Sequence, residues 1–151
     1  MLEQVKEEPP VYLMQSGSHI STPICVLLEL QPGLYVSRKD KVGSETITTF
    51  DLRLTKPNGE PVMNTAEMHT MEHLAATYLR NEPVWKSKVI YFGPMGCRTG
   101  FYFLVRSGVI SHEQAIELTK QAFDFIASFE GEIPGVSAKE CGNYRDRKSV
   151  V

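Results

Sequence analysis

Two histidines and a glutamate have the spacing of a metal site on a helix, in the run His69-Thr70-Met71-Glu72-His73. On an α-helix, residues four apart lie one turn apart on the same face, so both imidazoles can bind one metal ion. Glu72 lies on that face too, where a carboxylate beside a metal can act as a general acid or base without being a ligand. The alternative is that both histidines are ordinary surface or core residues bonded to their neighbours. We interpret the run as a metal site with Glu72 as its proton carrier.

A catalytic metal usually has three protein ligands and one open position, so a third donor must come from elsewhere in the chain. Cys141 is the leading candidate, because it lies in a loop-like segment before Gly142 and a metal would hold it as a thiolate. Cys97 lies between Gly96 and Arg98, where backbone can approach a ligand and positive charge favours a thiolate. We expect Cys141 to bind the metal and Cys97 to be a nucleophilic or acid/base thiol. An inert buried thiol is the alternative for each.

Other candidate residues receive structural interpretations. Cys25 lies in an apolar run, where a free cysteine is usually a small core residue. His19 and His112 are expected to be solvent-exposed bystanders, and His112 falls at a helix N-terminus that disfavours its charged form. Arg53 shares a strand face with Asp51, so the residues alone favour half of an ion pair over a substrate contact.

Hydrophobic periodicity predicts the strands that position these residues. Apolar and polar residues alternate over 45–54, which predicts a half-buried strand with Asp51 and Arg53 on its polar face. Two β-rich runs, 88–92 and 101–105, flank a Gly-rich segment and predict a hairpin with an elaborate connection.

Two capping boxes predict helices. Asn64 with Glu67 precedes the run that carries both histidines, and Ser111 with Gln114 precedes a second apolar stripe that continues to Gly131. We expect the first helix to carry the chemistry and the second to be mostly structural.

The chain has the length and composition of one globular domain. Its 151 residues can bury roughly 68–70% of the unfolded surface in one core. Hydrophobic residues are 42%, charged residues 23% and the net charge is −2, which excludes disorder, collagen and coiled coil. The near-neutral charge argues against nucleic acid as a partner, and the apolar runs are far shorter than the ~20 residues that span a bilayer. We therefore expect no membrane partner and a small-molecule substrate.

The N-terminus and the cysteines indicate the compartment. Residues 1–20 are polar and contain Pro, Ser and Gly, so we expect a poorly ordered or atypical segment there and a single domain over 21–151. The acidic start is unlike the positively charged start of a secretory signal. Three cysteines cannot all pair in disulfides, so a reduced, cytoplasmic location is expected.

Three separated motifs, in this order, together resemble the S-ribosylhomocysteine lyase (LuxS) family. The resemblance runs from about Glu29 to Asp146 and implies an α+β fold, with an antiparallel β-sheet packed against α-helices. It also implies a homodimer with its active sites at the subunit interface. The motifs are His69-Thr70-Met71-Glu72-His73-Leu74, Gly93-Pro94-Met95-Gly96-Cys97-Arg98-Thr99-Gly100-Phe101 and Cys141-Gly142-Asn143-Tyr144-Arg145-Asp146.

The resemblance implies an activity and a metal. The family cleaves S-ribosylhomocysteine to homocysteine and 4,5-dihydroxy-2,3-pentanedione, the precursor of the quorum-sensing signal autoinducer-2, by metal-assisted carbonyl migration and β-elimination. It also recycles a product of methyl transfer. His69, His73 and Cys141 would hold one divalent metal per subunit, Fe(II) in the family, although such ligands also accept Zn or Co. Glu72 and Cys97 would carry protons.

The resemblance also gives Arg53 a role. In the family the matching arginine lies near the reactive cysteine, where positive charge lowers a thiol pKa. We expect Arg53 to act in catalysis and, with Gly96 and Arg98, to contact substrate.

The sequence departs from the family pattern at both ends. Leu27 stands where the family has a substrate-binding histidine, and the family continues into a further helix after Asp146. We hypothesise a frameshifted or truncated family member with its metal site intact. The alternatives are a metallohydrolase, because H-x-x-E-H also marks inverted zinc peptidases, and a catalytically impaired, metal-binding family member. The first alternative leaves Cys97 and its Gly-rich segment unexplained.

Overall fold

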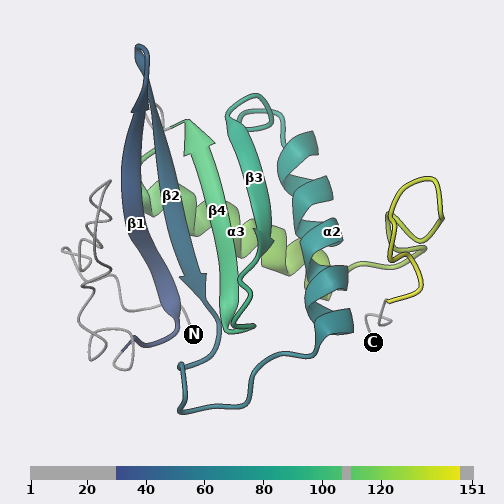
Figure 1. Ribbon diagram of the computed structural model, residues 1–151. Helices are drawn as coiled ribbons and strands as arrows, with labels where there is room; N and C mark the ends of the chain where they lie inside the picture. The colour runs from purple at the N-terminus through teal and green to yellow at the C-terminus, as the bar shows by residue number, and fades with distance from the viewer. Residues whose placement is uncertain (1–29, 107–109, 147–151) are drawn as a thin grey trace.

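The computed structural model describes residues 30–106 and 110–146 as a four-stranded antiparallel sheet and two helices. The strands lie in the order β1-β2-β4-β3. Helix α3 crosses behind the sheet and α2 lies beside β3 at one edge (Figure 1). The expected α+β fold is confirmed, whereas the predictions for residues 1–20, His19, Cys25 and Leu27 fall outside the described residues. The strands are β1 Gly33–Val42, β2 Glu45–Arg53, β3 Val89–Pro94 and β4 Gly100–Arg106, and the helices are α2 Thr65–Asn81 and α3 His112–Ala127.

Strand β2 has the predicted alternation of faces, but its second half is buried on both faces rather than half-buried, since Asp51 and Arg53 are only 3 and 7% exposed. Phe50 and Leu52 are buried in the core, while Asp51 and Arg53 lie together on the opposite face because successive side chains of a strand point to opposite sides. In the register with β4, Arg53 lies opposite Gly100. This pairing brings the end of β2 to the loop that carries Cys97.

Strands β3 and β4 form the predicted hairpin, but β1 was not predicted. After Leu34 and Val36, β1 is dominated by polar and charged residues and has a bulge between Val36 and Arg38. Among the described strands it lies at an edge of the sheet. Natural sheets protect such edges with charged residues and bulges, so the sequence lacks a clear apolar alternation here.

Both predicted capping boxes are present. Asn64 accepts from the backbone of α2 and Ser111 accepts from the backbone of α3. Helix α3 ends at Ala127, before the expected stop at Gly131, and the hydroxyl of its C-cap Ser128 donates to the Asp124 carbonyl of the last turn at 2.8 Å. In the described ranges neither helix has the length and apolarity that a membrane span requires.

The core lies between the sheet and the helices. Phenylalanines from three strands stack here, with ring centroids 5.1 Å apart for Phe92 and Phe101 and 6.0 Å for Phe50 and Phe103. Leu74 and Ala75 of α2 are fully buried against this layer. The packing fixes which face of α2 turns inward, and His69, Glu72 and His73 are left half-buried at its border.

Candidate active site

The structure brings His69, His73 and Cys141 together. One ligand atom from each lies within 4.8 Å of the others, and all three side chains are half-buried. The two imidazoles stand one turn apart on α2, with ring centroids 5.0 Å apart. Cys141 reaches them from the C-terminal loop, and its sulfur lies 3.4 Å from His69 Nε2. Two nitrogens and a sulfur at these separations suit a borderline divalent cation.

The His69 ring is oriented by the same loop. Its Nδ1 lies 2.9 Å from the backbone carbonyl oxygen of Asp146, which can only accept, so Nδ1 carries the hydrogen. This tautomer places the lone pair on Nε2, the nitrogen that faces Cys141. A ligating histidine typically donates its second nitrogen to such a partner, which fixes the ring and makes it a better ligand.

Turns hold the loop in place. The Cys141 backbone N–H donates to the Ser137 carbonyl at 3.1 Å, and the Asp146 N–H donates to the Asn143 carbonyl at 3.1 Å. The Asp146 carboxylate lies 4.0 Å from His69 Nδ1. The loop therefore supplies both a sulfur donor and the group that orients a nitrogen donor.

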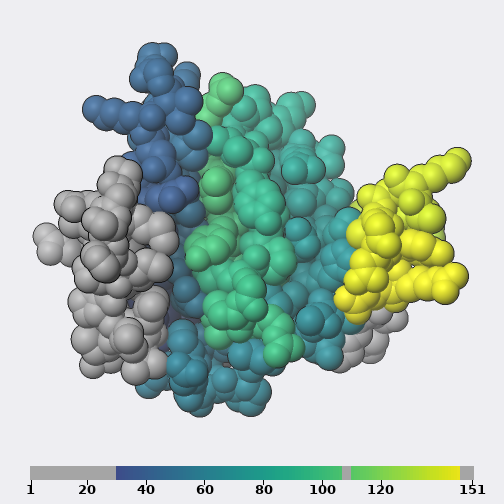
Figure 2. Space-filling view, viewed as in Figure 1, coloured from purple at the N-terminus to yellow at the C-terminus, as the bar shows by residue number. Residues whose placement is uncertain are grey.

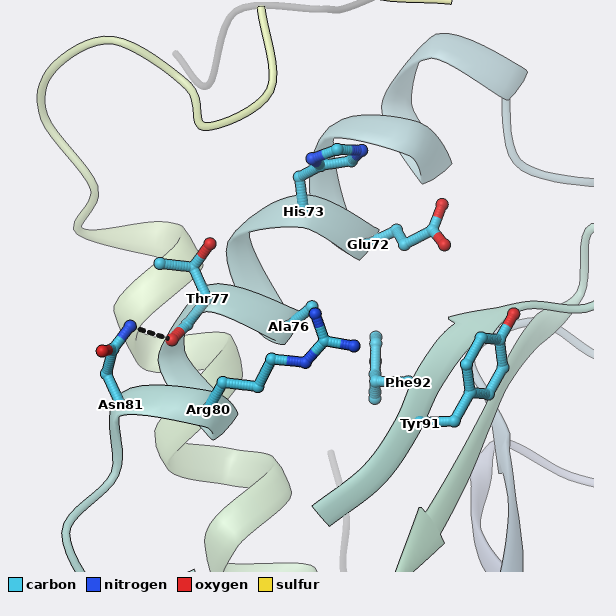
Figure 3. Close-up of a pocket in the computed structure, with 8 residues that line it drawn as sticks. All are labelled: Glu72, His73, Ala76, Thr77, Arg80, Asn81, Tyr91 and Phe92. Carbon is cyan, nitrogen blue, oxygen red and sulfur yellow. Dashed lines mark hydrogen bonds between the residues drawn. The ribbon is translucent and has the colours of Figure 1, made fainter. Parts of the chain in front are cut away.

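Glu72 lies where two hollows meet. One hollow, of about 340 Å³, lies between α2 and β3. Figure 3 shows Arg80 extending through it toward Phe92, with Tyr91 on the far wall. Burial raises the pKa of the Tyr91 hydroxyl and the charge of Glu72 raises it further, so this phenol keeps its proton at neutral pH. The lining residues are Glu72, His73, Ala76, Thr77, Arg80, Asn81, Tyr91 and Phe92.

The second hollow, of about 430 Å³, runs from the start of α2 to the Gly-rich loop. Gly96 and Arg98, both predicted to contact substrate, line it together with Glu72 and His69. The backbone of Arg98 has φ 61°, a left-handed conformation that turns the chain sharply after Cys97.

The Cys97 thiol is exposed at the tip of this loop. Its sulfur lies 3.1 Å from the Thr99 hydroxyl and 3.6 Å from Arg53 Nη1. Burial of neighbouring surface raises the Cys97 pKa, but hydrogen bonds from the Thr99 hydroxyl and backbone and the positive Arg53 outweigh this effect and lower it. The thiol is thus biased toward the thiolate, as a nucleophile or base requires.

Arg53 is held under the loop by Asp51. Its Nε and Nη2 donate to the two carboxylate oxygens at 2.7 and 2.9 Å, and both residues are buried. Burial lowers the Arg53 pKa, yet the paired carboxylate raises it above its ordinary value, so the guanidinium stays charged. The ion pair with Asp51 and the contact with Cys97 are both present, whereas a contact of Arg53 with substrate stays a prediction.

The prediction for His112 is wrong. This residue is half-buried rather than exposed, its Nε2 lies 3.0 Å from the Leu34 carbonyl, and its ring stacks on Phe50 at 6.2 Å. It links α3 to the start of β1. Contacts with the neighbouring strands, rather than the position at a helix end, decide the burial of this side chain.

Sequence reasoning missed several residues of the site. The Thr99 hydroxyl contacts the Cys97 sulfur, Asp146 orients His69, and Arg80 with Tyr91 lines the hollow beside Glu72. Arg80 had a usable signal, because it lies eight residues after Glu72 on the same helix face. Thr99 had none, since only the left-handed turn at Arg98 directs it back toward the sulfur.

The sequence is similar to one protein family and to individual members of it. The sequence model of the family S-Ribosylhomocysteinase (LuxS) matches residues 27–149. An S-ribosylhomocysteine lyase of Finegoldia magna is 62% identical over 119 residues, which are 79% of this chain and 74% of that protein. One of Clostridium acetobutylicum is 58% identical over 119 residues, 79% of this chain and 75% of that protein. One of Phocaeicola vulgatus is 55% identical over 117 residues, 78% and 72% of the two chains.

Proposed function

Because the chain belongs to the LuxS family, we propose that it is a lyase that cleaves S-ribosylhomocysteine to homocysteine and 4,5-dihydroxy-2,3-pentanedione, the precursor of autoinducer-2. Two observations carry this function. His69, His73 and Cys141 converge, and the loop that holds Cys97, a thiol biased toward the thiolate, lines a hollow together with His69 through Gly96 and Arg98. A metallohydrolase would need the first feature but not the second.

His69, His73 and Cys141 would hold one divalent cation. Imidazole and thiolate accept Fe(II), Zn and Co, and we propose Fe(II) because the family resemblance implies it. When bound, the cation supplies Lewis-acid polarisation of a substrate carbonyl. The His69 ring needs no reorientation for this role, because Asp146 already holds its tautomer.

The chain's own residues move the protons. Shifting a carbonyl along a sugar chain requires a proton to leave one carbon and a proton to return to its neighbour. The Cys97 thiolate, held by Thr99 and Arg53, accepts the first proton at its sulfur. Glu72 on α2 carries protons from the other side of the hollow. In the last step a proton is removed from carbon and the sulfur of homocysteine leaves by β-elimination.

The hollow beside Glu72 suits the amino-acid end of the substrate. Arg80 lines it and is exposed, so its guanidinium can bind the carboxylate of the homocysteine part. Gly96 and Arg98 line the second hollow and would contact the sugar part, with Arg53 acting beneath them. The substrate would then lie along α2 with its reacting carbons near Glu72.

A homodimer is the assembly that we propose. The sheet face opposite α3 is not covered by either helix in the described part of the chain (Figure 2). Tyr102, Tyr91 and Ile90 of this sheet are 39, 43 and 40% exposed, and aromatic residues are enriched in interfaces. We also propose a cytoplasmic location, because both thiols must stay reduced. Sedimentation analysis tests the dimer.

Incubating anaerobically prepared, metal-loaded protein with S-ribosylhomocysteine and titrating free thiol tests the activity. Release of homocysteine supports the lyase; peptide cleavage or no reaction supports a metallohydrolase or a metal-binding protein without activity. The matched variant is Cys97→Ala, which should lose turnover and keep its metal. Loss of metal from this variant would show that the roles of Cys97 and Cys141 are reversed.

A further inference from the structure

The Thr99 hydroxyl lies between a guanidinium and the reactive sulfur. Its oxygen is 2.5 Å from Arg53 Nη1 and 3.1 Å from Cys97 Sγ, whereas Arg53 Nη1 itself lies 3.6 Å from the sulfur. Thr99 is 3% exposed although Cys97 is exposed, so the hydroxyl approaches the sulfur from the protein side. Water and substrate can reach only the other side of the sulfur.

Chemistry fixes the direction of both hydrogen bonds. A guanidinium only donates, so the Thr99 oxygen must accept from Arg53. The hydroxyl has one hydrogen, and with its oxygen already accepting, this hydrogen can be donated to the Cys97 sulfur. A thiolate accepts and cannot donate, so the arrangement is complementary to the charged sulfur.

The backbone holds this hydroxyl in place. The Thr99 carbonyl accepts from the N–H groups of Leu54 and Thr55 at 3.0 and 3.2 Å. The next residue, Gly100, pairs with Arg53, and a Cβ there would lie 1.9 Å from the Leu52 carbonyl oxygen, so the strands meet too closely for any other residue. Thr99 therefore cannot drift away from the sulfur without separating β2 from β4.

We propose that Thr99 is a positioning residue of this site, whose hydroxyl donates a hydrogen bond that helps to hold Cys97 as a thiolate in the direction set by Arg53 and Asp51. This inference rests on the proposed function only for its catalytic consequence. The groups that act electrostatically on the sulfur are Arg53, from β2, and Tyr102, from β4, with Asp51 behind the guanidinium. Thr99 adds a neutral donor that is closer to the sulfur than the cation.

The test compares Thr99→Val, which replaces the hydroxyl with a methyl group of similar size, with Thr99→Ser, which keeps the hydroxyl. Metal-loaded protein is alkylated with iodoacetamide at a series of pH values, quenched and digested with trypsin. Cleavage after Lys88 and Arg98 releases residues 89–98, in which Cys97 is the only cysteine. The variants are compared by the midpoint of the pH profile and not by the rate at high pH. A thiolate of higher pKa is also more nucleophilic, which changes the rate at high pH but not the midpoint.

Thr99→Val should move the midpoint to higher pH and slow Cys97 alkylation about tenfold below it, the effect of one lost hydrogen bond to a charged group at a partly exposed site. Thr99→Ser should stay within about twofold of the parent. If valine prevents folding, Thr99→Ala takes its place, since it removes the hydroxyl without adding an atom. An unchanged midpoint in the hydroxyl-free variant, or an equal shift in Thr99→Ser, would overturn the proposal.

A second readout separates this inference from the proposed function. In the thiol-release assay, the low-pH limb of kcat/KM should move with the alkylation midpoint while bound metal stays unchanged. A shifted alkylation midpoint in a protein without lyase activity would leave the role of Thr99 standing and refute the function. If the parent protein is an active lyase and its Thr99→Val variant is alkylated like the parent, the proposed function is supported and the role of Thr99 is refuted.

Discussion

Replacing Asp51 with asparagine should destabilise the protein by about 3 kcal/mol. The Asp51 and Arg53 side chains are only 5 and 8% exposed, and two hydrogen bonds of 2.7 and 2.9 Å join them. Removing one partner of a buried pair leaves an uncompensated charge, which costs about 3–5 kcal/mol, and asparagine keeps one acceptor oxygen, so the lower end applies. This is a large part of the 5–15 kcal/mol that holds such a domain together.

The chain offers a matched control. Arg38 and Asp40 of β1 form a second pair with the same spacing, at 2.8 Å, but their side chains are 49 and 45% exposed. Asp40→Asn should therefore change the free energy of unfolding by less than about 1 kcal/mol.

Urea unfolding followed by fluorescence measures both variants, because the single tryptophan, Trp85, packs against the core. The expected midpoints are clearly lower for Asp51→Asn and close to the parent for Asp40→Asn. Equal losses in the two variants would refute the reasoning, since burial would then not decide the cost of breaking the pair.

Other predictions concern the metal ligands, the substrate and the strand contact. Cys141→Ser should weaken metal binding at least about 100-fold, since outer-shell changes alone cost 10–100-fold, while Cys97→Ser keeps the metal; elemental analysis of dialysed protein measures this. Arg80→Met should raise KM about tenfold with little change in kcat, and steady-state kinetics showing a lower kcat instead would contradict a binding role. Gly100→Ala should lower the free energy of unfolding in urea by about 3 kcal/mol, because its Cβ would collide with the Leu52 carbonyl. Gly96→Ala, with nothing within 4 Å of its Cβ, should lower it by less than about 0.5 kcal/mol.

Local patterns predicted the elements that depend on local physics. The alternation around Asp51 and Arg53 placed both on one strand face, and the capping boxes at Asn64 and Ser111 placed both helix starts. Strand β1 was not predicted because its second half has charged residues that face solvent and no apolar face. Its position depends on pairing with β2, which the sequence of β1 alone does not show.

The site was predictable only in part. The i, i+4 spacing places His69 and His73 side by side from geometry alone, but Cys141 lies 72 residues beyond His69 and reaches it through turns that carry no periodic signal. The choice of Cys141 therefore depended on ligand chemistry and on the family resemblance. The roles of His69, His73 and Cys141 as metal ligands stay predictions, as do the roles of Glu72 and Cys97 as proton carriers.

The C-terminal loop depends on its attachment to α2 for its position. It has no helix or strand of its own between α3 and Asp146, and the contacts of Cys141 and of the Asp146 carbonyl with α2 converge on the His69 ring. A cation shared by His69, His73 and Cys141 would thus work as a removable cross-link between distant parts of the chain, with the entropic benefit of closing a long loop. Chelation should then expose the loop to proteases while the sheet and α3 stay folded.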